Sequence, residues 1–168
     1  MSAVKRHLIG MWSLLVGLRV TFLHLWKKPV TLQYPDETWD LPIGAKGQLF
    51  NLIEDCIGCL QCARVCPVDC IAIETAKAGK EEDLGETSDG HKKKLHVLRF
   101  DIDFAKCCYC SLCTDPCPTE CLYMTKEYEN SVYNRGNLIH HYATYAPEEV
   151  EKLRASVDGK TLTIGIYP

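Results

Sequence analysis

The sequence of 168 residues predicts an α+β fold, and three observations lead to that prediction. Most of its 11 cysteines fall into two similar runs, short apolar segments flank a charged loop, and apolar side chains near the N-terminus recur with a helical period. The hydrophobic content of 46% and the charged content of 24% are ordinary for a globular protein. The formal charge of −3 argues against a nucleic-acid-binding protein, which would usually be strongly basic.

Residues 1–28 are predicted to form an amphipathic helix at a membrane surface. The apolar side chains recur at steps of three and four residues: Leu8, Met11, Trp12, Leu15, Leu18, Phe22, Leu25 and Trp26. The segment has five basic residues and no acidic residue, so its charge is +5, whereas the rest of the chain carries −8. The longest uncharged run, residues 7–18, is shorter than the ~20 residues that span a bilayer. We therefore expect a helix in the membrane interface or against a membrane subunit, with a docking helix buried in protein as the alternative.

The middle of the chain divides by composition. Residues 29–48 carry Pro, Gly and acidic residues without periodicity and are predicted to be an extended connector. Residues 49–125 form a cysteine-rich body. Within this body, residues 76–94 are charged and aperiodic, which predicts a solvated surface loop between strands at 71–73 and 95–102.

Residues 126–168 are predicted to be a C-terminal docking tail. A proline followed by acidic residues predicts a short helix over 147–153. A predicted turn at 157–160 then leads into a predicted strand over 161–166.

The cysteine-rich body contains an internal duplication. The spacing C-x2-C-x2-C-x3-C-P occurs at residues 56–67 and again at 107–118, and every aligned pair is 51 residues apart. This is the ligand run of bacterial two-cluster ferredoxins, in which the fourth cysteine of each run ligates the other cluster. The two-residue gaps let a tight loop direct three thiolates to one cluster, whereas the fourth side chain points away from its own loop.

The predicted fold class is therefore a bacterial-type two-cluster (2×4Fe–4S) ferredoxin-like domain with eight cysteine ligands. The ligands predicted for one cluster are Cys56, Cys59, Cys62 and Cys117, and those for the second are Cys107, Cys110, Cys113 and Cys66. Zinc is the competing interpretation, but a zinc site uses four ligands, so the third and fourth cysteines of each run would be surplus. A disulfide framework fits less well, because the cysteine count is odd and no secretory signal is evident.

Three cysteines remain outside the predicted ligand set. Cys70 and Cys121 each lie four residues past a fourth ligand, and we expect both to be small buried groups beside a cluster, with replacement of a neighbouring ligand as the alternative. Cys108 is expected to pack in the same way. The residues expected to form an apolar shell around the clusters are Ile57, Ile71, Ile73, Leu112, Leu122 and Met124.

The remaining polar residues predict no catalytic site. None of the six histidines has a ligand spacing with the cysteines. His140 and His141 could contact a partner or line a proton path, although surface or packing roles fit better. The sequence contains no nucleophile elbow, phosphate-binding glycine loop or paired carboxylates, so the hypothesis is one-electron transfer between partners.

Four further motifs accompany the cysteines: GLRVT at 17–21, PVTLQYP at 29–35, FDIDFAKC at 100–107 and EYE at 127–129. With the eight cysteines, they resemble the two-cluster ferredoxin-like subunit I of respiratory complex I, the NADH–quinone oxidoreductase (the TYKY subunit in mitochondria). The resemblance covers roughly residues 14–142, and all eight ligand positions of the family are matched.

The resemblance implies an electron-transfer subunit of a membrane-bound complex. Its two 4Fe–4S clusters would pass electrons toward a terminal cluster on a neighbouring subunit and then to quinone. Its expected partners are other peripheral-arm subunits, a membrane subunit near the quinone site and the membrane surface, at the cytoplasmic face of the bacterial inner membrane. The alternatives are the equivalent subunit of a ferredoxin-dependent photosynthetic-type complex or of a membrane-bound hydrogenase, and a soluble two-cluster ferredoxin. A basic, apolar helix has no role on a diffusible carrier, which favours the membrane-bound assignments.

Overall fold

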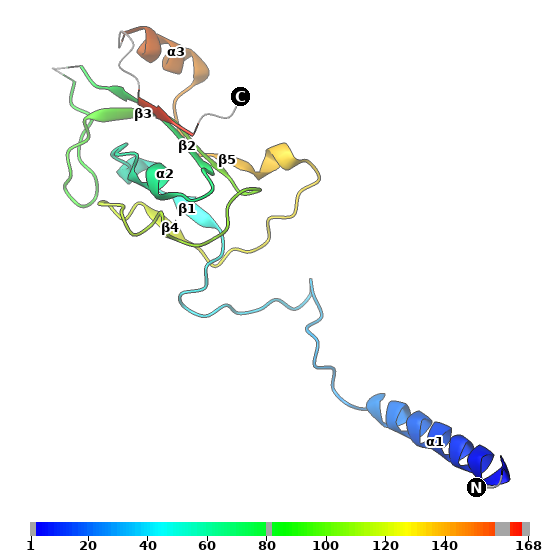
Figure 1. Ribbon diagram of the computed structural model, residues 1–168. Helices are drawn as coiled ribbons and strands as arrows, with labels where there is room; N and C mark the ends of the chain where they lie inside the picture. The colour runs from blue at the N-terminus through cyan, green and yellow to red at the C-terminus, as the bar shows by residue number, and fades with distance from the viewer. Residues whose placement is uncertain (1–2, 80–81, 157–161, 166–168) are drawn as a thin grey trace. The chain divides into compact units, whose positions relative to one another are not determined.

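Two antiparallel strands, β2 (Ile71–Lys77) and β3 (Leu95–Asp103), form the centre of the fold in the computed structural model (Figure 1). The structure describes residues 3–79, 82–156 and 162–165, and it contains two compact units, residues 1–40 and 41–168. Strand pairing ends where Lys77 lies opposite Leu95, so the loop predicted at 76–94 begins after Lys77. Both strands are rich in buried β-branched and aromatic side chains, which favour a pleated sheet covered on its faces.

Two short strands from the C-terminal segment complete this sheet. β5 (Ile139–His141) pairs with β3 and β6 (Leu162–Ile164) pairs with β2, which gives the antiparallel order β5-β3-β2-β6. β6 lies within the strand predicted over 161–166, whereas the predicted turn at 157–160 lies outside the described residues. Residues 126–168 therefore belong to the sheet at both of its edges, in addition to any docking role.

A second, two-stranded sheet repeats the register of the first. It pairs β1 (Leu49–Asn51) with β4 (Leu122–Met124). Asn51 lies opposite Leu122 in this sheet, and Ile102 lies opposite Ile71 in the first sheet. These two pairs are equivalent, because Ile102 is 51 residues after Asn51 and Leu122 is 51 residues after Ile71, the same offset as between the cysteine runs. The internal duplication therefore extends from the cysteine runs into the strands on either side of them.

Buried charged groups of β2 and β3 hold the C-terminal segment to the body. The ion pairs are Glu74 with Arg154, Asp101 with His141 (Oδ1 to Nδ1, 2.6 Å) and Asp103 with Arg135 (Oδ2 to Nη2, 2.8 Å). Arg154 lies on α3 (Pro147–Ser156), which was predicted over 147–153, and Arg135 lies on the 3-10 helix η2 (Arg135–Leu138). An unpaired carboxylate in the core would cost several kcal/mol, on the order of the penalty for breaking a buried ion pair, so Glu74 and Asp103 depend on their arginine partners, whereas Asp101 also pairs with Arg99 of β3.

The N-terminal unit contains one helix, α1 (Ala3–His24), among its described residues. Its apolar side chains are exposed within this chain, for example Trp12 and Leu14 at 69% and 70%. The helix continues through Arg19, past the uncharged run that was predicted to be too short to span a bilayer, and its placement in the membrane interface stays a prediction. By length and composition alone, Val4–His24 is apolar enough to cross a membrane.

A prediction concerns Gly47, where the chain enters β1. A Cβ atom at this position would meet the backbone carbonyl oxygens of Glu127 and Thr125, the latter at 2.6 Å. We expect Gly47→Ala to destabilise the iron-loaded protein by about 1–3 kcal/mol, because backbone atoms cannot rotate away as a side chain can. Circular dichroism would show this as a lower midpoint of thermal unfolding.

The matched control is Gly136→Ala. The nearest atom to a Cβ at Gly136 is the side-chain oxygen of Asn134, at an ordinary 3.5 Å, so we expect a change within about 0.5 kcal/mol. Equal midpoints for the two variants would contradict the close approach at Gly47.

Candidate metal centre

Each cysteine run begins in a loop that uses left-handed backbone conformations at equivalent positions. Gly58 and its counterpart Tyr109 have φ angles of 69° and 53°, and Leu60 and its counterpart Ser111 have φ angles of 63° and 65°. Such residues reverse the loop and so turn three cysteine side chains to the same side. Gly58 has a second constraint, because a Cβ there would lie 2.9 Å from Cγ2 of Thr75.

The first loop connects a 3-10 helix to a short α-helix. η1 (Ile53–Asp55) ends immediately before Cys56, and α2 (Gln61–Val65) carries Cys62 on its buried face. The chain then leaves α2 in an extended conformation at Cys66, which directs this fourth side chain away from its own loop.

Four of the predicted ligands converge on one cavity. Its lining includes Cys56, Cys59, Cys62 and Cys117, so three cysteines come from the first run and one from the second. The same cavity is lined by Asn51, whose side-chain oxygen and nitrogen are buried without a hydrogen-bond partner. A buried, unpartnered polar group beside four thiols indicates a site that receives a polar group.

The other four predicted ligands also lie together. Burial raises the pKa of Cys113 to about 12, and negative charge on Cys107, Cys66 and Cys110 raises it further. These interactions place Cys66 of the first run among three cysteines of the second run. Cys117 and Cys66 thus each lie near cysteines of the opposite run, and the assignment of all eight residues as ligands stays a prediction from their spacing.

The electrostatics of the two sets suit a metal cluster. Burial, followed by the charge on Cys59, raises the pKa of Cys62 to about 12, so this thiol and Cys113 would stay protonated without a compensating positive charge. Bound iron would supply that charge and favour the thiolate forms of these residues. Within the described ranges, no three His, Cys, Asp or Glu side chains surround a single ion, and a cluster requires no such group because each thiolate binds a different iron.

The two first cysteines of the runs are stabilised as thiolates by equivalent contacts. A hydrogen bond from Cys70, then one from the Tyr109 amide, lowers the pKa of Cys107 to about 6. A hydrogen bond from Cys121, then one from the Gly58 amide, lowers the pKa of Cys56. Each thiol donor follows the run opposite to that of its acceptor, and each amide donor lies in the acceptor's own loop. The two thiol contacts therefore link the two halves in both directions.

Comparisons with known proteins agree with this geometry. A family model of the 4Fe-4S dicluster domain matches residues 55–121. NADH-quinone oxidoreductase subunit I 2 of Geobacter metallireducens is 34% identical over 130 residues, which cover 75% of this chain and 90% of that protein. The chain belongs to the subunit I family of NADH-quinone oxidoreductases. The two 4Fe–4S clusters expected from the spacing are thereby confirmed as its cofactors.

Other relatives of this subunit I family member are longer than the chain. NADH-quinone oxidoreductase subunit I 2 of Streptomyces coelicolor is 38% identical over 125 residues, covering 74% of this chain and 62% of that protein. NAD(P)H-quinone oxidoreductase subunit I of Gloeobacter violaceus is 38% identical over 122 residues, covering 73% and 53%. The chain therefore spans between half and two thirds of these two relatives. A chain of the archaeal membrane-bound sulfane sulfur reductase matches with 26% identity and a TM-score of 0.46, covering 71% of this chain and 56% of that one.

The three cysteines outside the predicted ligand set differ in their burial. Cys70 and Cys121 are buried, as predicted, and their sulfurs lie 3.4 Å from Sγ of Cys66 and 3.5 Å from Sγ of Cys117. The prediction that Cys108 packs beside a cluster is wrong, because it lies on the outer side of its loop and is exposed.

The predicted apolar shell is correct except at one position. Ile71, Ile73 and Leu122 are buried, Ile57 lines the first cavity, and Met124 packs against the core. Leu112 was expected in this shell but is 48% exposed, since it follows the left-handed Ser111 and faces outward.

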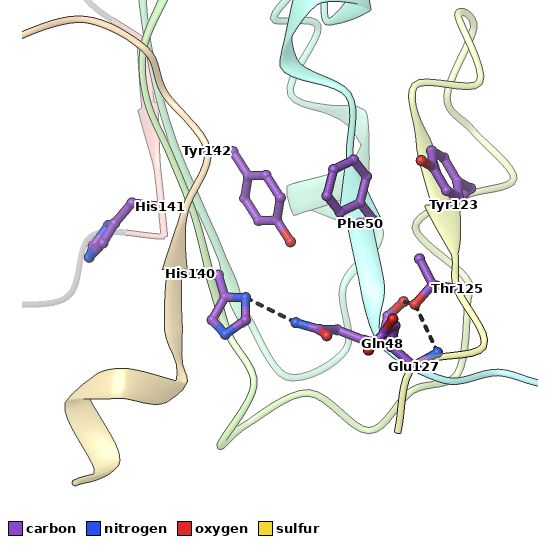
Figure 2. A pocket seen from close by; sticks show the side chains of 8 residues that line it. All are labelled: Gln48, Phe50, Tyr123, Thr125, Glu127, His140, His141 and Tyr142. Atoms are coloured by element: carbon purple, nitrogen blue, oxygen red, sulfur yellow. Dashed lines mark hydrogen bonds between the residues drawn. The ribbon is translucent and has the colours of Figure 1, made fainter. Parts of the chain in front are cut away.

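The two adjacent histidines of this subunit I family member point to opposite faces of β5 (Figure 2). His140 packs against Phe104, with ring centroids 4.6 Å apart, and its Nδ1 lies 3.0 Å from Nε2 of Gln48. His141 pairs with Asp101. Both histidines therefore make packing or ion-pair contacts within the fold.

A surface pocket that the sequence did not indicate lies between β1, β4 and β5. Phe50 stands between Tyr142 and Tyr123, with ring centroids 5.6 Å and 5.5 Å away (Figure 2). Asn51 and Thr119, both in the first metal cavity, were also missed. The signal for Asn51 is the alternation of buried and exposed residues along β1, which turns it inward next to Leu49.

A prediction of metal content follows for this subunit I family member. Two 4Fe–4S clusters require about eight irons and about eight sulfides per chain in the anaerobically purified protein. Iron and acid-labile sulfide assays, with the visible absorbance of the clusters, would measure this. One tightly bound zinc without that absorbance would contradict the assignment of the site.

Proposed function

We propose that the chain relays electrons within a membrane-bound NADH–quinone oxidoreductase, toward the terminal cluster and quinone. The observation that carries the proposal is the interleaving of two thiol sets, each with three cysteines from one run and one from the other. Charge on Cys113 contributes to the pKa of Cys62, so the two sets approach one another at these buried residues. Short separation is the requirement for electron transfer between two clusters.

The ligand assignment forms part of this proposal. One cluster is held by Cys56, Cys59, Cys62 and Cys117, and the second by Cys107, Cys110, Cys113 and Cys66. When bound, the clusters accept and release single electrons. The chain itself supplies thiolates, amide donors at Gly58 and Tyr109, and a buried shell that limits access of water.

The proposed partners follow from the two ends of the chain. Residues 1–28 would contact the membrane surface and a membrane subunit near the quinone site, with residues 29–48 as an extended connector. Exposed apolar side chains along α1 and a charge of +5 support this placement. Residues 126–168, beside the ferredoxin-like body at 49–125, would dock against other peripheral-arm subunits. The location would be the cytoplasmic face of the bacterial inner membrane.

The alternatives differ in how much of this proposal they share. The equivalent subunit of a ferredoxin-dependent photosynthetic-type complex would use the same clusters with another electron donor, and the name of the Gloeobacter relative, an NAD(P)H-quinone oxidoreductase subunit, keeps the donor open. A membrane-bound hydrogenase subunit would likewise share the clusters. A soluble two-cluster ferredoxin has no use for α1, whose apolar side chains would face water.

Crossed ligation predicts which cluster each fourth cysteine controls. Cys66→Ser should impair the cluster of the second run, and Cys117→Ser should impair that of the first, because each serine removes a thiolate from the opposite set. EPR spectra and iron content should show the loss of one cluster in each variant. Cys108→Ser is the control and should retain both clusters, since Cys108 is exposed. A Cys66→Ser protein with an intact second cluster would disprove the crossed assignment.

Membrane attachment through α1 predicts resistance to salt and release by alkali. Leu15→Glu with Leu18→Glu should reduce the membrane-bound fraction at least tenfold, because a buried leucine contributes about 1.5–3 kcal/mol and about 1.4 kcal/mol is a factor of ten. The control is Ser13→Glu with Thr21→Glu, which adds the same charge on the narrow polar side of the helix. Immunoblots of washed membranes measure the bound fraction. Recovery of the unaltered chain as a soluble monomer at ordinary salt would remove the membrane-bound function.

A further inference from the structure

Asn51 is a buried side chain whose polar atoms have no hydrogen-bond partner among the residues that the structure describes. Its exposed fraction is 2%, and neither Oδ1 nor Nδ2 makes a hydrogen bond. A buried amide without a partner is destabilising and requires an explanation, such as a redox role or a bound water. Its position supplies one, because Asn51 lines the cavity that Cys56, Cys59, Cys62 and Cys117 also line.

The strand geometry shows why the side chain faces this cavity. Residues alternate along β1, so Leu49 and Asn51 are buried and Phe50 between them is exposed. Asn51 lies opposite Leu122 on β4, which is a second lining residue of the cavity. The amide is thus held by regular strand pairing rather than by a mobile loop.

The second half of the duplication has no such group. The equivalent of Asn51 is Ile102, which is completely buried and lies opposite Ile71 as Asn51 lies opposite Leu122. Near the second thiol set, an apolar side chain therefore takes the position that the Asn51 amide takes near the first thiol set.

A second position shows the same asymmetry. Thr119 is 4% exposed, lines the first cavity, and its Oγ1 lies 3.8 Å from Sγ of Cys117. Its equivalent in the first run is Val68, which is apolar and 39% exposed. Cys70 and Cys121, in contrast, are equivalent to one another and make equivalent sulfur contacts, so they do not distinguish the two sites.

We infer that the Asn51 amide donates a hydrogen bond to the cluster held by Cys56, Cys59, Cys62 and Cys117, and raises its reduction potential. The inference rests on the ligand assignment proposed above. Reduction adds a negative charge to a cluster, so a donor to its sulfur atoms stabilises the reduced state more than the oxidised state. Asn51 is a positioning and tuning residue specific to the first cluster.

The test is a redox titration followed by EPR on the full chain with both clusters assembled. Asn51→Leu should make reduction of the first cluster about tenfold less favourable, a shift of about 59 mV to lower potential for a one-electron couple. The second cluster should not shift. The Cys66→Ser protein, which retains only the first cluster, identifies the signal that moves.

Two sets of variants distinguish the effect of a hydrogen-bond donor on the reduction potential from the effect of altered packing. Asn51→Ser and Asn51→Ala differ only by a hydroxyl group, and the serine variant should have the higher potential of the two. Thr75→Val is the control, because the Thr75 hydroxyl is also buried without a partner but does not line the cavity. It should leave both potentials unchanged.

The outcomes distinguish this inference from the proposed function. Two intact clusters whose potentials are unchanged in Asn51→Leu, with a higher thermal stability, would show an unsatisfied or water-bound amide and overturn the inference alone. Equal shifts of both clusters, or equal potentials in the serine and alanine variants, would also overturn it. Absence of both clusters from the unaltered chain would overturn the proposed function and the inference together.

Discussion

The crossing of Cys66 and Cys117 into the opposite cysteine loops is the constraint on which the body of this protein depends. Each loop can direct only three thiols to one side, because its left-handed residues close it within a few residues of chain. The fourth thiol of each set must therefore come from a segment 51 residues away in the sequence. With the ligands proposed above, neither half would complete its site alone.

The strands follow from the same constraint. β1 pairs with β4 and β3 pairs with β2 in the same register, so each cysteine run is flanked by strands that belong to the two different sheets. This arrangement holds the loops at a fixed separation and buries the shell around Cys62 and Cys113. Rigid support of this kind is what keeps metal ligands in place when the charge of the site changes.

The C-terminal segment contributes through charge rather than through apolar burial. Glu74, Asp101 and Asp103 are buried on β2 and β3, and each has a side-chain partner from the residues after 126, although Asp101 also pairs with Arg99 of β3. The segment thereby supplies the ion-pair partners of Glu74 and Asp103 and a second partner of Asp101. A segment that is polar in composition thus forms both edge strands of the four-stranded sheet.

Spacing alone predicts the two-cluster fold class, which the family model confirms, because the geometry of a cubane allows few arrangements of thiols in a short loop. The eight ligands and their division into two sets are predictions from the same spacing. Helical periodicity likewise predicts α1, and composition predicts α3 and β6 in outline. The strands from residues 126–168, the exposure of Cys108 and the aromatic pocket beside Phe50 depend on long-range pairing, which local pattern does not report. Asn51 illustrates the difference most clearly. As a residue five positions before Cys56 it is an unremarkable polar side chain, and only the register of β1 against β4 turns it into the cavity as a buried donor.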